Sequence, residues 1–411
     1  MKNQIDALMQ ENQIDALLVT GSAIHNPAMV YLTGGGHVTS ADLIKLQQQP
    51  AVLFCGPMER DEAAKSGLTV RLYTDYPLKP LLDQADQNYT RALALRYRQM
   101  LTDMGLNRGR VALYGQVEIG PIFGILKELS QLLPEVEWVG FTRDPILMPA
   151  MMTKDLEEIE RIRRMAKITT EVVARTADFL THHRVENEVL VKPDDKPLTI
   201  GDVKSRINLW LSELGAENPE GTIFAIGRDA GVPHSSGNPA DFVRLGKTIV
   251  FDIFPCEAGG GFYYDFTRTW SLGYASDEAL ELYQQVKTVY DAIVSELTLN
   301  TPFSHYQQRT CQLLEKLGHP TIQSDPQAQE GYIHSIGHGL GLHIHEMPFS
   351  GAIAGSQDML VPGVVVTIEP GLYYPSREMG FRIEDTYFAR EDGVFERFAD
   401  FPYDFVLPMR H

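Results

Sequence analysis

YIHSIGHGLGLHIHEMPFSG, residues 332–351, is the stretch that most narrows the fold and the function of this 411-residue chain. It places four histidines within twelve residues and interleaves them with three glycines: His334, His338, His343 and His345. Histidine carries protons near neutral pH and is a frequent metal ligand, and glycine lets the backbone approach a ligand closely. A solvated surface or a packed core accounts less well for such a cluster, so the segment predicts a functional site.

Two carboxylates follow this segment on strand-like sequence. VPGVVVTIEPGLYYP, residues 361–375, places Glu369 directly after an apolar strand and before a Pro-Gly turn. GFRIEDTYFAR, residues 380–390, places Glu384 inside another strand pattern. Either glutamate alone could pair with a basic residue, for which Arg382 is the obvious candidate.

Two more carboxylates precede it in TIVFDIFPCEAGGGFYYDFTRTW, residues 248–270. Asp252 follows three β-branched or aromatic residues, so it should lie within or at the end of a buried strand. Asp265 lies inside a second run of this kind. An isolated buried carboxylate is costly, although each aspartate alone could be a turn residue at a strand end.

Taken together, four carboxylates on apolar strands would repel one another unless a counter-charge were bound. Two divalent cations cancel a formal charge of four and accept carboxylate oxygens, and such cations lie about 3.5–4 Å apart. Carboxylate and imidazole ligands without thiolate favour Mn²⁺, Co²⁺, Fe²⁺ or Zn²⁺ over Cu(I). The sequence therefore predicts a metal site formed by Asp252, Asp265, His338, Glu369 and Glu384.

Composition excludes several other classes of protein. Lys and Arg total 36 against 54 Asp and Glu, a net charge of −18, which disfavours nucleic acid and anionic membranes as partners. The first twenty residues do not resemble a signal peptide, and no run approaches the roughly 20 apolar residues of a membrane span. The three cysteines form no CxxC pair, so a reducing cytoplasm is expected: Cys55, Cys256 and Cys311.

The chain is long enough for two domains. In its first part, short apolar runs alternate with amphipathic stretches, which indicates a small α/β domain: residues 16–20, 51–55 and 111–114. The pattern breaks at TRDPILMPAMMT, residues 142–153. A long helix is then expected to start with Asp155, Glu157 and Glu158 in its first turn. We place the domains at residues 1–150 and 151–411.

The second part combines helices with β-rich runs. Residues 276–297 predict a helix whose apolar stripe is core: Leu282, Val286, Val289, Ile293 and Leu297. The β-rich runs are residues 248–254, 263–270, 364–368 and 381–389. The candidate ligands lie on or beside these runs.

These segments resemble the pita-bread metallopeptidases, which include aminopeptidase P, prolidase, methionine aminopeptidase and the non-metal enzyme creatinase. GHGLGLHIHEMP (337–348) is similar to the histidine signature of that family, TIEPGLY (367–373) to its first glutamate signature and GFRIED (380–385) to its second. IDALLVTGSAIHNPAMVYLTGG (14–35) resembles the creatinase-type N-terminal domain of prolidases and aminopeptidases P. The resemblance implies an α+β chain: an α/β N-terminal domain, then a catalytic domain whose curved antiparallel sheet is flanked by helices.

The resemblance also assigns roles to the predicted ligands. It makes Asp252 a ligand of one metal, and Asp265 and Glu384 ligands that bridge both metals. His338 and Glu369 become ligands of the other metal, and Glu369 is also the general base. The implied cations are Mn²⁺ or, alternatively, Co²⁺ or Zn²⁺.

Further residues around the ligands acquire roles in the same way. His234, in GVPHSSGNP, matches a histidine on the substrate side, and His345 matches one that steadies the tetrahedral intermediate. His334 matches a further active-site histidine, and Arg382 an arginine beside the metal site. His343 has no matching role and is expected to be a packing or surface residue.

One feature departs from the family pattern. Asp252 and Asp265 are thirteen positions apart, more than usual in the family, and DIFP follows where DxG is common. A longer hairpin, with the glycines at 259–261 absorbing the extra pair of residues, would keep both carboxylates in place because strand alternation is preserved. If the loop instead displaced Asp252, the site would hold one metal.

The implied activity is hydrolysis of the bond between an N-terminal residue and proline in dipeptides or short peptides, by a cytoplasmic homodimer. The alternative on the same fold is a non-peptidase amidohydrolase or lyase, such as a creatinase-like or ectoine-hydrolase-like enzyme. A catalytically silent binding module would be expected to have lost ligands. A dinucleotide-binding enzyme is disfavoured because no GxGxxG follows a strand into a helix.

Overall fold

The computed structural model describes residues 4–410, which fall into two compact units. Unit 1 comprises Met1–Met151 together with Gly259–Gly261, and unit 2 comprises Met152–Ala258 and Phe262–His411. Residues 1–3 and 411, the outer ends of the two predicted domains, lie outside the described residues.

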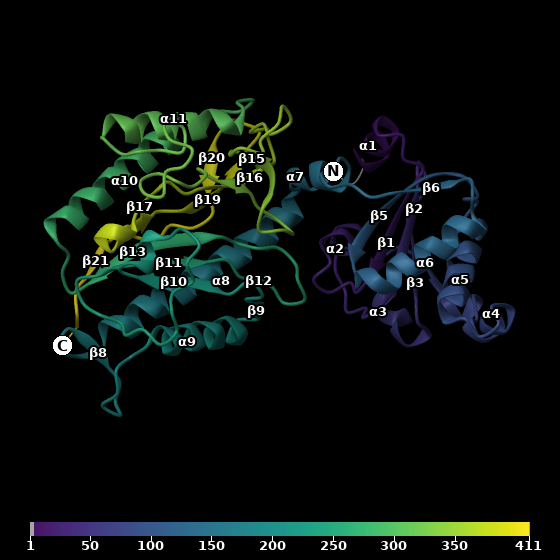
Figure 1. The fold of residues 1–411 in the computed structure, drawn as a ribbon, viewed down its shortest axis with the longest axis horizontal. Helices are drawn as coiled ribbons and strands as arrows, with labels where there is room; N and C mark the ends of the chain where they lie inside the picture. The colour runs from purple at the N-terminus through teal and green to yellow at the C-terminus, as the bar shows by residue number, and fades with distance from the viewer. Residues whose placement is uncertain (1–3, 411) are drawn as a thin grey trace. The chain divides into compact units, whose positions relative to one another are not determined.

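Unit 1 is an α/β unit built on a six-stranded mixed sheet of order β4-β3-β2-β1-β5-β6 (Figure 1). The central strand β1 pairs antiparallel with β2 and parallel with β5. The predicted apolar runs lie on β1, β3 and β5, and side chains such as Leu18, Ile44 and Phe54 form its core. The strands are β1 (Ala16–Gly21), β2 (Ala41–Leu46), β3 (Val52–Cys55), β4 (Thr69–Leu72), β5 (Gly109–Gln116) and β6 (Val136–Val139). The helices are α1 (Ile5–Glu11), α2 (Pro27–Thr33), α3 (Arg60–Ala64), α4 (Leu78–Gln84), α5 (Tyr89–Asp103), α6 (Ile119–Leu132) and α7 (Leu147–Met152).

Unit 2 contains two larger antiparallel arrays that carry the predicted site. A four-stranded sheet has the order β10-β11-β13-β21, and a five-stranded sheet has the order β15-β14-β16-β19-β20. Their strands are β10 (Thr222–Ile226), β11 (Thr248–Ile253), β13 (Phe266–Leu272), β21 (Val406–Leu407), β14 (His338–Gly339), β15 (Glu346–Phe349), β16 (Val365–Ile368), β19 (Asp385–Ala389) and β20 (Phe395–Arg397). Only the short β21 pairs parallel, with β13, among the strands of these two sheets that the structure describes.

Three two-stranded ladders complete the strands described in unit 2. They are β7 (Arg184–Glu186) with β8 (Val189–Val191), β9 (Ala216–Glu217) with β12 (Cys256–Glu257), and β17 (Gly371–Tyr374) with β18 (Met379–Arg382).

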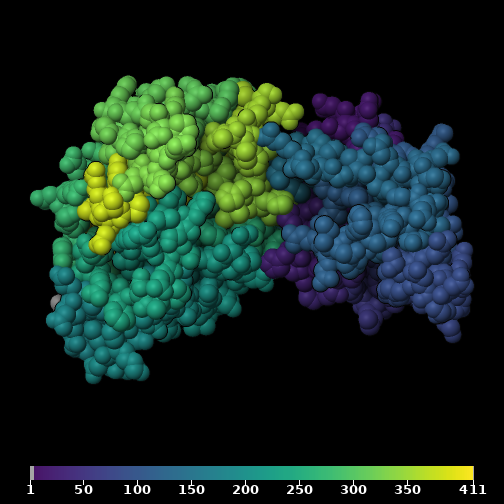
Figure 2. Space-filling view, viewed as in Figure 1, coloured from purple at the N-terminus to yellow at the C-terminus, as the bar shows by residue number. Residues whose placement is uncertain are grey.

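Four helices cover these sheets: α8 (Leu156–Thr181), α9 (Ile200–Glu213), α10 (Asp277–Glu296) and α11 (Phe303–Lys316). Helices α8 and α9 contact β13 and β10, whereas α10 and α11 contact β17, β18 and β15, so the helix pairs lie on opposite sides of the strands (Figure 1). Within this unit, the teal segments and the green to yellow segments pack into one continuous surface (Figure 2). The predicted stripe of α10 is buried in the core.

The start of α8 agrees with the sequence. Asp155 is the N-cap, its side chain accepts from the backbone N–H of Glu158, and the Glu158 carboxylate accepts from the backbone N–H of Asp155. This reciprocal capping box satisfies two N–H groups that the first turn leaves without a helical partner.

Two predicted strands have different bounds in the structure. Residues 381–389 are not one strand, because β18 ends at Arg382 and β19 begins at Asp385. At this break the chain leaves the β17-β18 ladder and joins the β16-β19 ladder. Asp265, predicted inside a strand, lies immediately before β13. In both cases the carboxylate lies at the edge of a ladder rather than within it.

The helices in the described part of the chain include none that combines the length and the apolar character required to span a membrane.

Candidate metal centre

Two neighbouring strands of the four-stranded sheet position the aspartates. Asp252 lies in β11, which is buried throughout, and Asp265 comes directly before β13. The register pairs Asp252 with Thr267 and Ile253 with Phe266, so both aspartates lie at the same end of the hairpin. The longer loop therefore keeps the two carboxylates together, as the preserved strand alternation predicts.

The other carboxylates reach the same place from the second array. Glu369 follows β16 directly, as predicted. Glu384 lies in the break between β18 and β19, where its backbone N–H donates to Thr267 O at 3.1 Å. The two glutamates and the two aspartates all line one cavity, so residues more than 130 positions apart, such as Asp252 and Glu384, converge.

His338 is the imidazole at the centre of this cluster. Its Nε2 lies 3.7 Å from Asp265 Oδ2 and 3.4 Å from Glu369 Oε1. Its Nδ1 lies 3.0 Å from Gly339 O, which assigns the ring proton to Nδ1 and leaves the Nε2 lone pair facing the carboxylates. Ligand atoms of Asp265, His338 and Glu384 all lie within 4.8 Å of one another, a spacing that can hold a metal ion.

Several oxygens in the cluster have unfilled hydrogen-bonding capacity. Asp252 Oδ1, Asp265 Oδ1 and Glu384 Oε1 are buried and find no hydrogen-bond partner among residues 4–410. A buried oxygen without a partner is destabilising. In their ionised form the three carboxylates accept but do not donate, so a bound cation can satisfy all three oxygens. The donor set therefore fits a metal centre.

Arg382 and Thr267 each donate a hydrogen bond to one carboxylate of the cluster. Arg382 Nη2 donates to Asp252 Oδ2 at 2.5 Å, and Arg382 Nη1 donates to the Tyr373 hydroxyl at 2.8 Å. Thr267 Oγ1 donates to Glu384 Oε2 at 2.7 Å. Each of these carboxylates thus keeps one oxygen hydrogen-bonded and turns the other, unpartnered oxygen into the cluster.

The remaining predicted histidines surround the cluster. His234 Nε2 lies 3.1 Å from His334 Nε2, and His334 Nδ1 lies 3.4 Å from Glu369 Oε2. The rings of His338 and His345 pack with their centroids 4.3 Å apart. All four line the cavity, whereas His343 does not; its backbone N–H donates to Glu346 Oε1 at 3.0 Å.

The cavity has a volume of about 470 Å³ and lies entirely within unit 2. Sequence reasoning missed several residues of its wall: Lys204, Asn208, Asn218, Glu220, Thr222, Ile223, Ser236, Phe254 and Ile344. It also missed Thr267 and Tyr373, because neither residue type indicates a site until its partner is placed. The GVPHSSGNP motif contains Ser236, which was the one signal in the sequence for that part of the wall.

Burial governs the protonation of this cluster in the metal-free chain. It raises the pKa of Glu369 to about 8, an effect opposed by Arg382 and reinforced by Asp252. Burial, followed by the charges of neighbouring carboxylates, raises the pKa values of Asp265 and Glu384 well above the ordinary range. Burial also lowers the pKa of His334 and of His338 to about 3, so both imidazoles are neutral near pH 7.

These shifts predict how the stability of the metal-free chain depends on pH. A raised carboxyl pKa gives stability that is complete below the unfolded value of 4.5 and is lost as pH rises through about 8. A lowered histidine pKa gives stability that is complete above 6.5 and is lost as pH falls towards 3. Above pH 6.5 the histidine contribution is constant, so only the carboxyl contribution changes.

With a chelator present, the melting temperature of the wild type should therefore fall between pH 6.5 and 8, and Glu369→Gln should fall less steeply. Thermal unfolding followed by circular dichroism at several pH values measures both slopes. The exposed Glu391→Gln should follow the wild type. Equal slopes for wild type and Glu369→Gln would contradict the assigned shift.

A buried ion pair supports the loop that carries the histidines. Lys154 Nζ donates to Glu346 Oε2 at 2.7 Å, and both side chains are almost fully buried, with 2% and 0% exposure. The other oxygen of Glu346 accepts the backbone N–H of His343. The pair therefore connects the segment before α8 to β15 and to the turn that presents His345.

Lys154→Met should destabilise the fold by about 3–5 kcal/mol, because it leaves the Glu346 carboxylate buried without its cation. Adding Glu346→Gln should recover part of this loss, since the amide removes the charge and keeps an acceptor for His343. Lys65→Met, which breaks an exposed pair with Glu62, should change stability by less than about 1 kcal/mol. Chemical denaturation of the wild type and these three variants measures the differences, and equal losses in Lys154→Met and Lys65→Met would refute this account.

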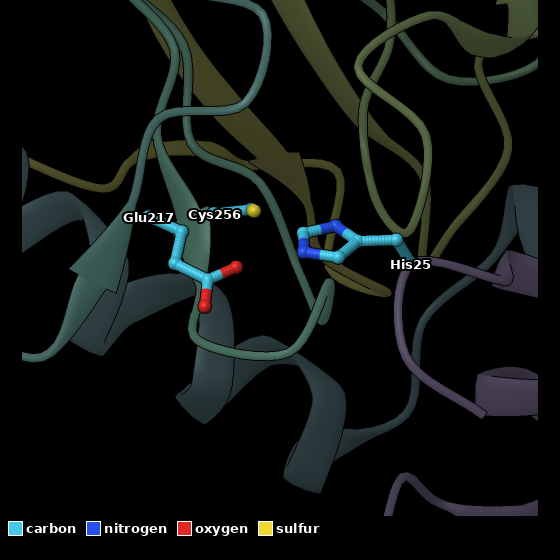
Figure 3. Close-up of side chains that lie close together, drawn as sticks. All are labelled: His25, Glu217 and Cys256. Carbon is cyan, nitrogen blue, oxygen red and sulfur yellow. The ribbon is translucent and has the colours of Figure 1, made fainter. Parts of the chain in front are cut away.

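The nearby thiol is not part of the carboxylate cluster. Cys256 and Glu217 lie opposite one another on the paired strands β12 and β9 (Figure 3). Burial, with the charge of Glu217, raises the pKa of Cys256 to about 12. A thiol with this pKa stays protonated near neutral pH, and a metal ligand must be a thiolate.

Comparisons with known proteins found relatives over much of the chain. The chain is 28% identical to the probable dipeptidase PepE of Mycobacterium tuberculosis over 249 residues, a match that covers 61% of this chain and 59% of that relative. It is 25% identical to a Xaa-Pro dipeptidase of Pyrococcus horikoshii over 399 residues, which covers 95% of this chain and 94% of that relative. The chain thus spans less than two thirds of the length of PepE.

A solved structure of a dipeptidase from Pyrococcus horikoshii shares the fold. It superposes with a TM-score of 0.74 at 20% identity and covers 98% of this chain and 99% of that one. This likeness confirms the predicted two-domain α+β fold. Residues 160–391, more than half of the chain, match the sequence model of metallopeptidase family M24. The chain therefore belongs to that family.

Proposed function

We propose that this chain hydrolyses the peptide bond between an N-terminal residue and proline in dipeptides or short peptides, with two divalent cations. The observation that carries the proposal is the convergence of four carboxylates in one cavity, three of them beside His338, with three buried oxygens that have no hydrogen-bond partner among residues 4–410. The names of the relatives support a peptidase of the Xaa-Pro type. A cavity of about 470 Å³ has the size of sites that enclose small ligands.

The proposed ligands are the five residues expected from the sequence. Asp252 would be a ligand of one cation, Asp265 and Glu384 would be ligands shared by both, and His338 and Glu369 would be ligands of the other. Cations held by these residues would supply Lewis-acid polarisation of the scissile carbonyl and would lower the pKa of an attacking water. Mn²⁺ is the proposed ion, with Co²⁺ and Zn²⁺ as alternatives that share the same oxygen and nitrogen donors.

The side chains of the protein perform the proton transfers and fix the geometry. Glu369 accepts the proton of the attacking water and returns it to the leaving nitrogen of proline. His234 and His345, which line the cavity, donate hydrogen bonds to the oxygen on which negative charge develops. Arg382 keeps Asp252 oriented, and His334 connects His234 to Glu369.

Metal analysis combined with hydrolysis of a peptide panel tests the proposal. The metal-depleted chain should regain activity with Mn²⁺, Co²⁺ or Zn²⁺ on dipeptides such as Ala-Pro and Gly-Pro, and should leave Ala-Ala uncleaved. Cleavage of no Xaa-Pro peptide, with cations shown to be bound, would reject the proposal and favour the amidohydrolase or lyase alternative.

We also propose residues 1–150 as a creatinase-type N-terminal domain and 151–411 as the catalytic domain, and a homodimer in the cytoplasm. The three cysteines are buried and unpaired, which suits a reducing compartment. Light scattering of the purified chain would test the proposed dimer.

A further inference from the structure

The cavity contains a cation that the proposed chemistry does not use. Lys204 lies on α9 and lines the same cavity as the carboxylate cluster. The described wall carries five carboxylates, the four of the cluster and Glu220, but only two side chains that are always cationic at neutral pH, Lys204 and Arg382. With two divalent cations bound as proposed, the four carboxylates of the cluster are neutralised, and the side-chain cations that an entering anion meets on this described wall are Lys204 and Arg382.

Arg382 is already occupied by its neighbours. Its side chain is 1% exposed, and its guanidinium donates to Asp252, to the Tyr373 hydroxyl, to Thr267 Oγ1 and to Pro233 O. These contacts use four of its five N–H donors and pair its charge with Asp252. Arg382 is therefore not available to bind an anion that enters the cavity.

Lys204 has a different environment. Its ammonium donates to the carbonyl oxygen of Ser236 and forms no ion pair with a carboxylate in the part of the chain that the structure describes. A lysine ammonium has three donors, so two remain for a ligand. Burial lowers the pKa of Lys204, which is the signature of a partly desolvated cation without a counter-ion.

The position of Lys204 connects it to the reacting groups. Ser236, its acceptor, is two residues from His234, and His234 contacts His334, which contacts Glu369. Lys204 therefore lies on the wall that also presents His234, on the proposed substrate side of the site.

The same wall also has a buried acceptor without a donor in the described chain, the side-chain oxygen of Asn218. Asn208, one helical turn after Lys204 on α9, accepts from the Asn218 amide at 2.8 Å, and that amide also donates to Thr222 Oγ1 at 2.9 Å. The buried Oδ1 of Asn218 has no donor among residues 4–410. A cation and a free acceptor on one wall match a ligand that has both a carboxylate and an N–H group.

We propose that Lys204 binds the free C-terminal carboxylate of the peptide substrate, and that the chain thereby selects peptides short enough to end within the cavity. This inference rests on the proposed Xaa-Pro peptidase function and specifies its substrate class. The carboxylate of a short peptide is an anion that the ammonium of Lys204 attracts.

Kinetics on matched acids and amides test this role. The substrates are a Xaa-Pro dipeptide and a Xaa-Pro-Xaa tripeptide, each with a free C-terminal carboxylate and with a C-terminal amide. In Lys204→Met, the acid-to-amide ratio of kcat/KM should fall about 10- to 100-fold for the peptide length that reaches Lys204, mainly through KM. Lys204→Arg should recover part of the ratio, because it restores the charge.

Lys196→Met is the matched control, since Lys196 is exposed, pairs with Asp194 and does not line the cavity. Its acid-to-amide ratio should equal that of the wild type, and melting curves verify that all variants are folded. An unchanged ratio in Lys204→Met at both peptide lengths would overturn the inference, whether or not overall activity fell. Failure of the proposed function itself looks different: the wild type would then cleave neither acid nor amide.

Discussion

Glu369→Gln should lower kcat by about three orders of magnitude, within the range that general acid–base catalysis contributes. Glutamine keeps the shape of the side chain and one carbonyl oxygen, but it cannot accept the proton of the attacking water. Glu369 is 4% exposed, with its two oxygens 3.4 Å from His338 Nε2 and from His334 Nδ1, so no other carboxylate can easily replace it. Steady-state kinetics on a Xaa-Pro dipeptide with saturating Mn²⁺ measures the effect.

Two accompanying measurements make this result specific. Metal content must be determined for the variant, because Glu369 is also a proposed ligand, and a loss of kcat with both cations retained identifies the lost proton transfer. Glu391→Gln, at an exposed position, should retain wild-type activity. Near wild-type turnover by Glu369→Gln would exclude the proposed role of this residue.

Asp265→Asn should weaken metal binding and, at the same time, stabilise the metal-free chain. Asp265 provides a buried oxygen without a partner and lies beside Asp252 and Glu369, whose charges raise its pKa after burial itself. Loss of a direct ligand should reduce affinity by more than the roughly 10- to 100-fold that loss of an outer partner causes. Asparagine is neutral, so it removes the free-energy cost of keeping a carboxyl group with a raised pKa buried among other carboxyl groups when no cation is bound.

Melting temperatures with a chelator and with excess Mn²⁺ measure both effects. The wild type should gain stability on metal binding, because a ligand that binds only the folded state stabilises it. Asp265→Asn should melt above the wild type in chelator and respond weakly to Mn²⁺, whereas the exposed Asp61→Asn should behave as the wild type does. A lower melting temperature for Asp265→Asn in chelator would show that the aspartate stabilises the fold without metal.

The candidate site residues could be selected from the sequence because their chemistry is concentrated in short segments. His338 lies among glycines, Glu369 stands between an apolar strand and a Pro-Gly turn, and Asp252 interrupts a buried strand. Such residue types are unusual in buried β structure. The sequence therefore indicates that these carboxylates are buried close together, where they would repel one another unless a shared cation neutralised them.

The sequence could not indicate where strands exchange partners. The run of residues 381–389 has continuous strand propensity, yet the chain changes sheets at Ile383 and Glu384, because Glu384 bonds to Thr267 of the other array. Long-range pairs are equally invisible: Lys154 and Glu346 are 192 positions apart. Lys204 looked like one of many surface lysines until α9 placed it in the cavity wall.

The most direct test of the account is anomalous diffraction from crystals grown with Mn²⁺. We expect two manganese ions about 3.5–4 Å apart, with Asp265 and Glu384 touching both and with His338 on one of them. Manganese bound elsewhere, or a cluster whose carboxylates keep their present positions with no ion between them at saturating Mn²⁺, would contradict it.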